Sequence, residues 1–210
     1  MLTCVAITPA APALAQTYTF EKSFPAGANA RLDIAAHRGA IVIIGDEDDQ
    51  IVINGTVGAR TGGFNMPLNR AELAASAANH PSIRQRGSTI EVRPPDDPLV
   101  DRAVTVDYEI HAPPGIAIMA ANDSGKVVLR GLTGGVSVRT QAGAIDVTFP
   151  PDAAVTIDAA TKSGTITVDR ARLAIEGAVE KGRVRATVHG GGVSVQLTSD
   201  RGDIRLQSAM

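Results

Sequence analysis

The sequence predicts an all-β fold, a β-solenoid similar to a β-helix, in which short strands stack coil upon coil. Three observations carry this prediction: a glycine-containing phrase returns along the chain, the residues after each glycine alternate between apolar and polar, and the apolar residues are mostly aliphatic. The phrase is clearest at residues 123–129, 141–147 and 162–168 and weaker at 181–184 and 200–206. Its glycines are separated by 18, 21, 18 and 20 residues, which is typical of stacked supersecondary units: Gly125, Gly143, Gly164, Gly182 and Gly202.

Each phrase alternates with a period of two, as a half-buried strand does when successive side chains point to opposite faces. A second set of short strands is expected between the phrases, at 136–138, 155–157, 173–175 and 193–197, which gives about two strands per coil of roughly 20 residues. The outward positions are mostly threonine, serine, glutamine, arginine and aspartate. The residues expected to face inward are Val127, Leu129, Ile145, Val147, Ile166, Val168, Ile204 and Leu206.

The composition suits a narrow interior and excludes some partners. Apolar residues make up 44% of the chain but aromatic residues only 3%, and tryptophan is absent, so aliphatic ladders are expected rather than a wide core built on rings. A net charge of −2 gives no electrostatic reason to expect nucleic acid or an anionic membrane as a partner. No apolar run is long enough to predict a membrane span.

Residues 1–15 are predicted to be a truncated signal peptide. The segment is apolar, and it ends in Ala13-Leu14-Ala15, a step of the kind that signal peptidase cleaves, although the basic start of such a signal is missing. The alternative is an ordinary N-terminal tail. An exported protein, periplasmic or at the cell surface, is therefore expected, and removal of Cys4 would leave it without disulfides or thiolate ligands.

Residues 16–210 are expected to form a single β-solenoid domain, with 58–82 as an irregular and helical insert. Before the insert, strands are predicted at 31–34, 41–44 and 50–57, with an acidic turn at 45–49. Within the insert, an alanine-rich helix is predicted from Arg70 to Ala78, capped by Asn69, covering one face or one end of the solenoid. After it we expect a hairpin at 83–92, a loop at 94–98 and a strand at 103–110.

No catalytic, cofactor-binding or metal-binding residue is predicted, and neither an enzyme nor a cofactor is expected. The acidic run 46–49 lacks the spacing of a calcium loop and is interpreted as a solvated turn, and the glycines at 190–192 as a tight corner. Ser124 and Ser163 precede corner glycines followed by strands, which does not fit a nucleophile elbow. The four histidines are far apart in sequence, without metal-ligand spacing: His37, His80, His111 and His189.

One catalytic alternative stays open, because parallel β-helices also carry enzymes that act on polysaccharides. Such an enzyme needs carboxylates that converge in a groove. The outward acids Asp146, Asp158, Asp169 and Asp203 are interspersed with threonine and arginine, and few aromatic residues are present to stack on sugar rings. The alternative function is therefore an envelope polysaccharide-acting enzyme on a β-helix scaffold.

The recurring phrases show a resemblance to a known family. Ser124-Gly125 and Ser163-Gly164, the Pro-Pro-Gly at 113–115 and the acidic turn after 41–44 resemble the bacterial putative-adhesin family, a β-solenoid domain of unknown function. The resemblance implies an exported or envelope-associated protein and a non-catalytic binding role, for which adhesion has been proposed. The expected partner is a protein or glycan of the cell envelope, and the family has no site residues to carry over.

A last expectation concerns the end of the solenoid. The phrase at 202–206 is the last in the sequence, so it is expected to form the open C-terminal coil. Open solenoid ends expose ladder edges. Asp203 and Arg205 put charge at that edge, and self-association through edge pairing is the hypothesis.

Overall fold

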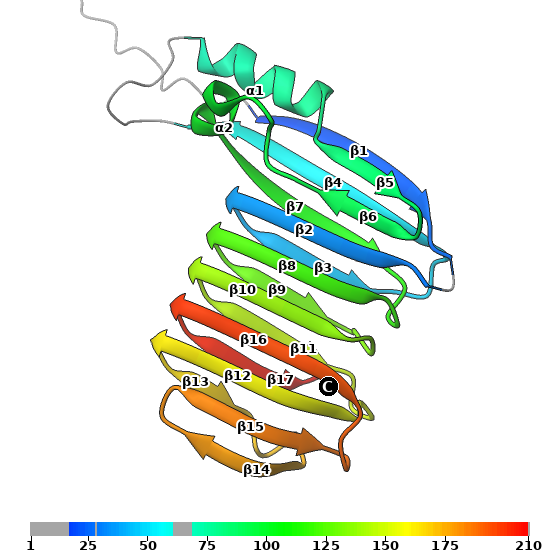
Figure 1. The fold of residues 1–210 in the computed structure, drawn as a ribbon, viewed down its shortest axis with the longest axis vertical. Coiled ribbons are helices and arrows are strands. Elements are labelled where there is room, and N and C mark those ends of the chain that lie inside the picture. The colour runs from blue at the N-terminus through cyan, green and yellow to red at the C-terminus, as the bar shows by residue number, and fades with distance from the viewer. Residues whose placement is uncertain (1–16, 28, 61–68, 210) are drawn as a thin grey trace, which may run out of the picture.

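The computed structural model describes residues 17–27, 29–60 and 69–209, which form two β-sheets that enclose one core, with two short helices at one end (Figure 1). The all-β prediction is confirmed. The eight-stranded sheet has the order β1(Thr17–Pro25)-β4(Gln50–Ala59)-β7(Val104–Ala112)-β3(Ile41–Gly45)-β9(Val127–Arg130)-β11(Ile145–Phe149)-β17(Ile204–Ser208)-β13(Ile166–Val168). The nine-stranded sheet has the order β14(Ile175–Glu180)-β15(Arg183–Val188)-β12(Val155–Ser163)-β16(Val193–Arg201)-β10(Val136–Ala142)-β8(Ala117–Ser124)-β2(Arg31–Arg38)-β6(Thr89–Val92)-β5(Ile83–Arg86).

The chain passes repeatedly from the nine-stranded sheet to the eight-stranded sheet, which makes the middle of the molecule solenoid-like. Four of the five glycine phrases supply a strand of the eight-stranded sheet, namely β9, β11, β13 and β17, and the strand before each of these lies in the other sheet. Ladders between neighbouring coils are parallel, for example β8 with β10 and β9 with β11. Antiparallel ladders occur at both ends of the stack, between β1, β4 and β7 and between β12, β15 and β14.

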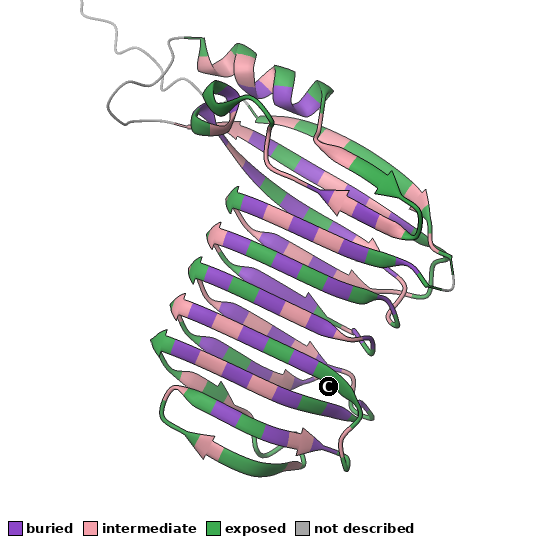
Figure 2. Ribbon diagram, in the orientation of Figure 1, coloured by how far each residue is buried: buried purple, intermediate pink, exposed green. Residues whose placement is uncertain are grey.

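The core lies between the sheets and follows the predicted alternation, which Figure 2 shows as alternating buried and less buried residues along most strands. Six of the eight residues predicted to face inward are buried: Val127, Leu129, Ile145, Val147, Ile204 and Leu206. Ile166 and Val168 are only half-buried. Their strand, β13, is the last of its sheet, so no further coil covers them.

A column of glycines runs along one corner of the stack and explains why the phrase needs glycine. A Cβ added to Gly125 would collide with the carbonyl oxygen of Gly39, and one added to Gly143 would collide with that of Gly125. The column continues through Gly202 to Gly164 in the same way. Adjacent coils are therefore too close at this corner for any side chain, and Gly125 also has a φ of +134° that other residues rarely adopt.

The structure corrects the predicted position of the last phrase. β16 and β17 do not form an open end, because β16 lies between β10 and β12 and β17 lies between β11 and β13. The last coil is thus inserted between two coils that are consecutive in sequence. Asp203 and Arg205 accordingly lie within the stack and not at its edge.

The weak phrase at 181–184 is also not a coil corner. Gly182, with a φ of +78°, sits in the turn between the antiparallel strands β14 and β15. The strand predicted at 173–175 begins only at Ile175, although Leu173 is buried. This hairpin extends the nine-stranded sheet beyond β12, where an additional coil was expected.

The insert covers one end of the stack, as predicted. Helix α1(Arg70–Asn79) packs against β1, β4 and β7 through its buried alanines. The predicted side-chain cap is wrong, because Asn69 makes no capping hydrogen bond. β4 continues to Ala59, two residues beyond the predicted strand.

A second helix and the first strand were not predicted. Helix α2(Pro98–Ala103) begins where a loop was expected: Asp97 accepts a hydrogen bond from the Leu99 N–H, and Pro98 occupies the first turn. β1 pairs along its full length with β4. The hairpin β5–β6 confirms the pair expected at 83–92.

The predicted signal peptide at 1–15, including Cys4, lies outside the described residues. Within the described ranges, neither helix is long and apolar enough to cross a membrane.

Candidate binding surface

The outer face of the nine-stranded sheet carries mostly short side chains in rows that cross the strands. The register aligns Met119 with Ser137, Ser137 with Gln196, and Gln196 with Asp158. A second row joins Ala121, Arg139, Thr198 and Ala160, which come from the same four strands. These rows form a broad surface with hydroxyl and amide groups, which we call the β8–β12 face.

An apolar patch lies at the β2 side of this face. Met119 is 59% exposed, which is unusual for a large apolar side chain, and Ala117 and Ala121 flank it on β8. A shallow depression beside it is lined by Arg31, Asp33, Thr89, Ala117 and Met119. Methionine is flexible and polarisable, so an exposed one among small residues can adapt to the shape of a partner.

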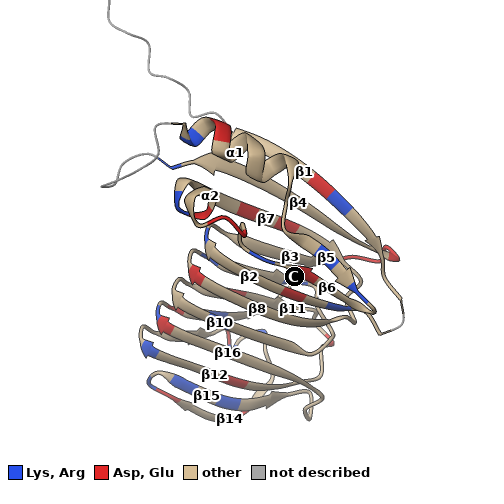
Figure 3. Cartoon of the chain, turned by 45° about the horizontal axis from the view of Figure 1, so that its top comes forward, with Lys and Arg blue, Asp and Glu red and all other residues tan. Residues whose placement is uncertain are grey.

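Most charges at the margins of the β8–β12 face neutralise one another. Arg93 donates to both carboxylate oxygens of Asp33 at 3.0 and 2.7 Å, and this hydrogen bonding raises the pKa of the guanidinium. At the other margin, Arg183 and Arg185 both contact Asp158. Figure 3 shows charged residues mainly near strand ends, and in the middle of β8, β10 and β16 the one charged residue is Arg139 of β10. The face is therefore suited to hydrogen bonding and apolar contact more than to steering by charge.

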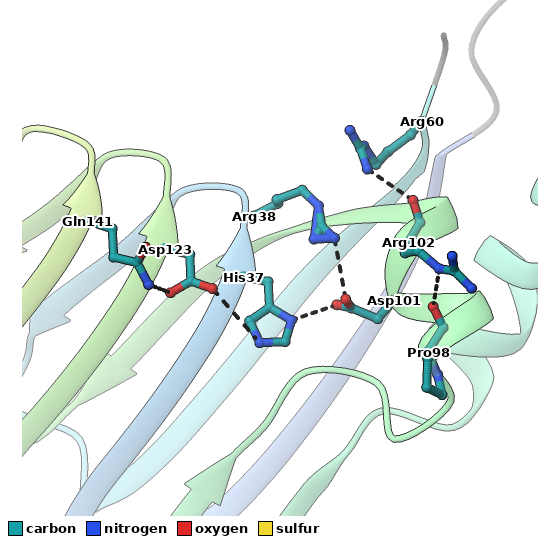
Figure 4. A network of polar contacts seen from close by, with 8 residues as sticks. All are labelled: His37, Arg38, Arg60, Pro98, Asp101, Arg102, Asp123 and Gln141. Carbon is teal, nitrogen blue, oxygen red and sulfur yellow. Dashed lines mark hydrogen bonds and ion pairs between the residues drawn. The ribbon is translucent and has the colours of Figure 1, made fainter. Parts of the chain in front are cut away.

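A polar network follows the coil corners beside this face (Figure 4). His37 lies between two carboxylates, with Nδ1 3.0 Å from Asp101 of α2 and Nε2 3.9 Å from Asp123. Arg38 also contacts Asp101, at 3.3 Å, and Gln141 donates to Asp123 at 2.6 Å. The network thus links the helical end to three successive corners of the stack, those of Gly39, Gly125 and Gly143.

Further along the stack, the equivalent corner positions form an ion pair. Lys162 and Asp200, each two residues before a corner glycine, lie 2.8 Å apart. The lysine ammonium lowers the pKa of the Asp200 carboxyl below its usual value. Because both groups are at the surface, the pair orients the corner and contributes little to stability.

The outer face of the eight-stranded sheet has a separate polar depression at β4, β7 and β3. Its lining includes Val42, Asn54, Thr56, Asp107 and Glu109. Asp107 accepts a hydrogen bond from the Ala40 N–H at 2.7 Å. Glu109 approaches His111 Nε2 at 3.3 Å. The depression therefore brings two carboxylates together, each already engaged by a neighbouring group of the sheet.

His111 lies beside this depression between two acids. Its Nδ1 is 2.8 Å from Asp46, the first residue of the acidic turn, and its Nε2 contacts Glu109. The hydrogen bond to Asp46 is the main cause of a raised pKa at His111. Tyr108, between Asp107 and Glu109 on β7, points inward: it is 6% exposed and packs edge to face with Phe20, and burial raises its pKa to about 12. Its ring is not available to stack on a ligand.

The residues considered for chemistry do not converge. His37 and His111 belong to different sheets, and His189 approaches only the Ala153 carbonyl oxygen. The backbone carbonyl oxygens of Ser124 and Ser163 accept hydrogen bonds from the N–H groups of corner glycines in adjacent coils. Across the described ranges, no three histidine, cysteine or acidic side chains lie close enough to hold a metal ion.

A buried polar column beside the glycines was missed by the sequence reasoning. Three of its members donate to corner carbonyls: Asn122 to Gly39, Ser199 to Gly143 and Thr161 to Gly202, at 2.9, 3.2 and 2.9 Å. Thr140 is the fourth member and aligns with both Asn122 and Ser199. Each of the four lies three residues before a corner glycine, a spacing visible in the sequence that could have identified the column.

Comparison with known proteins shows a family that the repeat resembles. Residues 114–207 match the model of the family described as Toastrack DUF4097, so this part of the chain is similar to that family. The predicted resemblance to the bacterial putative-adhesin family is confirmed by this match. No curated protein matches the sequence.

Solved bacterial structures resemble the chain at low sequence identity. A structure described as a putative cell adhesion protein from Clostridium sporogenes aligns with a TM-score of 0.55 and 11% identity, over 92% of this chain and all of that chain. One described as a putative adhesin from Parabacteroides distasonis has a TM-score of 0.31 and 7% identity, over 90% of this chain and 70% of that chain. The first likeness supports the fold that the sheets and ladders define.

Proposed function

We propose that the protein is an exported, adhesin-like binding module that holds a protein or glycan of the cell envelope on the β8–β12 face. The observation that carries the proposal is the composition of that face: exposed hydroxyl, amide and small apolar side chains, in register across adjacent parallel strands. Hydrogen-bonding groups on a rigid sheet are already oriented before a partner binds, which lowers the entropic cost of binding. The Toastrack match and the fold of the Clostridium sporogenes protein are consistent with this role.

Met119 is the expected centre of the contact. Its exposed side chain and the flanking alanines offer apolar area, and Ser137 and Gln196 supply hydrogen bonds in the same row. Apolar anchors surrounded by polar groups are the arrangement in which a few residues dominate binding energy. Export to the periplasm or the cell surface is also part of the proposal, because envelope partners are accessible there.

The test replaces residues on this face and on a control face. In the double variant Met119→Glu and Ser137→Glu, binding of the purified protein to immobilised envelope proteins and envelope polysaccharides is expected to fall at least tenfold. The matched control is Thr167→Glu, an exposed position on the outer face of the other sheet. If the double variant folds and binds like the unmodified chain while the control behaves in the same way, the proposed face is wrong.

A second candidate function rests on the depression of the eight-stranded sheet. Asp107 and Glu109 are two residues apart on β7, so their Cα atoms are separated by about 7 Å and both side chains reach the same depression. Paired carboxylates are what an enzyme that acts on envelope polysaccharide would use. Cleavage of such polysaccharides by the unmodified chain, abolished in Asp107→Asn and in Glu109→Gln, would support this candidate over the first.

A further inference from the structure

The coil formed by β16 and β17 occupies a slot between the β10–β11 coil and the β12–β13 coil. Its four ladders are all parallel: β16 pairs with β10 and β12, and β17 pairs with β11 and β13. The sheet order places no direct ladder between the two flanking coils, although residues 136–168 carry both. The slot is therefore made by one stretch of chain and filled by a later one.

Specific side-chain contacts match the inserted coil to both walls of the slot. On the β10–β11 side, Gln207 donates to Thr148 at 2.9 Å and Ser199 donates to the Gly143 carbonyl oxygen. On the other side, Lys162 pairs with Asp200, and the Thr165 N–H donates to Asp203 at 2.8 Å. The same contacts can form whether the coil comes from the same chain or from a second copy of it.

The connection that leads into this coil is short and contains one conformationally strained residue, His189. It spans residues 189–192, and three consecutive residues in it have left-handed φ values: His189 at +49°, Gly190 at +78° and Gly191 at +86°. A left-handed conformation is unfavourable at a residue other than glycine, such as His189. Strained hinge loops favour exchange of the element that they hold, because the opened hinge releases the strain.

We propose that the β16–β17 coil exchanges between two copies of this chain, so that the coil of each copy fills the slot of the other. Every contact within the slot is then kept, and only the hinge changes conformation. The partner is a second copy, and the product is an intertwined dimer. A dimer of this kind would present two β8–β12 faces, but the proposal does not depend on what those faces bind.

Cysteine pairs placed across the slot give a direct test. Thr148 and Gln207 are partners on β11 and β17. One preparation of the full chain carries Thr148→Cys, the other carries Gln207→Cys, and both carry Cys4→Ser. The two are unfolded, mixed at high concentration, refolded and oxidised. We expect a disulfide-linked dimer containing one of each variant, several-fold above a control mixture of Thr148→Cys with Thr19→Cys on the distant strand β1.

The double variant Thr148→Cys and Gln207→Cys shows whether the geometry allows the bond. If this single chain closes an internal disulfide while the mixture gives no covalent dimer above the control, exchange is overturned. A hinge variant adds a second readout. His189→Gly removes the left-handed strain and is expected to lower the dimer fraction of the refolded mixture several-fold. An unchanged fraction would overturn the role of the hinge.

Discussion

The middle of the stack and its two ends are built in different ways. In the middle, parallel coils approach one another so closely that only glycine fits at the corner, and buried hydroxyl or amide groups bind the corner carbonyls. At the ends, antiparallel strands replace the coils, and helices α1 and α2 cover one end. The comparison shows that the repeat specifies stacking, whereas termination of the stack needs segments without the repeat.

The largest expected effect compares one ladder position in the middle with its equivalent at the end. Ile145 and Ile166 occupy corresponding places on β11 and β13, but Ile145 is 0% exposed and Ile166 is half-buried. Ile145→Asp is expected to abolish folding, because an unpaired buried charge costs several kcal/mol. Ile166→Asp should leave a folded protein with reduced stability. Urea unfolding followed by circular dichroism measures both, and equal losses would contradict the distinction between middle and end.

A smaller loss is expected from a methyl group at a corner. In Gly143→Ala the new Cβ would collide with the backbone carbonyl of Gly125, which cannot move aside as a flexible side chain would. We expect a loss of about 2 kcal/mol or more in the free energy of unfolding, of the order found for overpacked interiors. Gly115→Ala is the control, since nothing lies within 4 Å of its added Cβ. Similar stability of the two variants would mean that close coil approach is not what requires glycine.

Each residue of the polar column should contribute less to the free energy of unfolding than a corner glycine does. Thr161→Val keeps the shape of the side chain but removes the hydroxyl that donates to the Gly202 carbonyl oxygen. That carbonyl oxygen then loses one hydrogen bond. The expected loss is about 1 kcal/mol, the typical net value of a buried hydrogen bond. Thr167→Val, on the exposed face of β13, should change stability by less than about 0.5 kcal/mol. Thermal unfolding of both variants measures the difference. If the Thr161 variant is as stable as the control, the polar column does not stabilise the fold.

The smallest effect is a pH dependence at the helical end. His111 has a raised pKa in the folded protein, mainly through its hydrogen bond to Asp46. Its stabilising contribution is therefore fully present below the unfolded pKa of about 6.5 and is lost as the pH rises through the folded pKa. The stability difference between the unmodified chain and His111→Gln should shrink between pH 6 and pH 9. A difference that grows with pH would have the wrong sign.

The sequence was sufficient for the regular part of the fold, because its signals are local. Alternation and corner glycines correctly gave the strands around Gly125, Gly143 and Gly164 and their inward residues. The alanine-rich helix was also predicted within one residue of its end, although its Asn69 cap was not formed. Each of these features depends on neighbours in sequence and on nothing further away.

The order of the coils could not be predicted in the same way. The phrases that form β13 and β17 have the same pattern, so alternation alone allows either strand to lie beside β11 in the sheet. Contacts between coils, such as Gln207 with Thr148 and Lys162 with Asp200, select the inserted arrangement. The proposed binding face could be predicted only as outward polar positions, because the row that contains Met119 depends on the register of several strands.

The insertion of the β16–β17 coil between two earlier coils is tested most directly by comparing two double-cysteine variants. Ser137 on β10 aligns with Gln196 on β16, and Gln196 aligns with Asp158 on β12. If β16 is inserted, Ser137→Cys with Gln196→Cys should close an intramolecular disulfide, because Cα atoms on adjacent strands are about 5 Å apart, within the range of a disulfide. Ser137→Cys with Asp158→Cys should remain reduced under the same oxidation. Closure of the second pair and not the first would mean that the coils stack in sequence order, and would contradict the account.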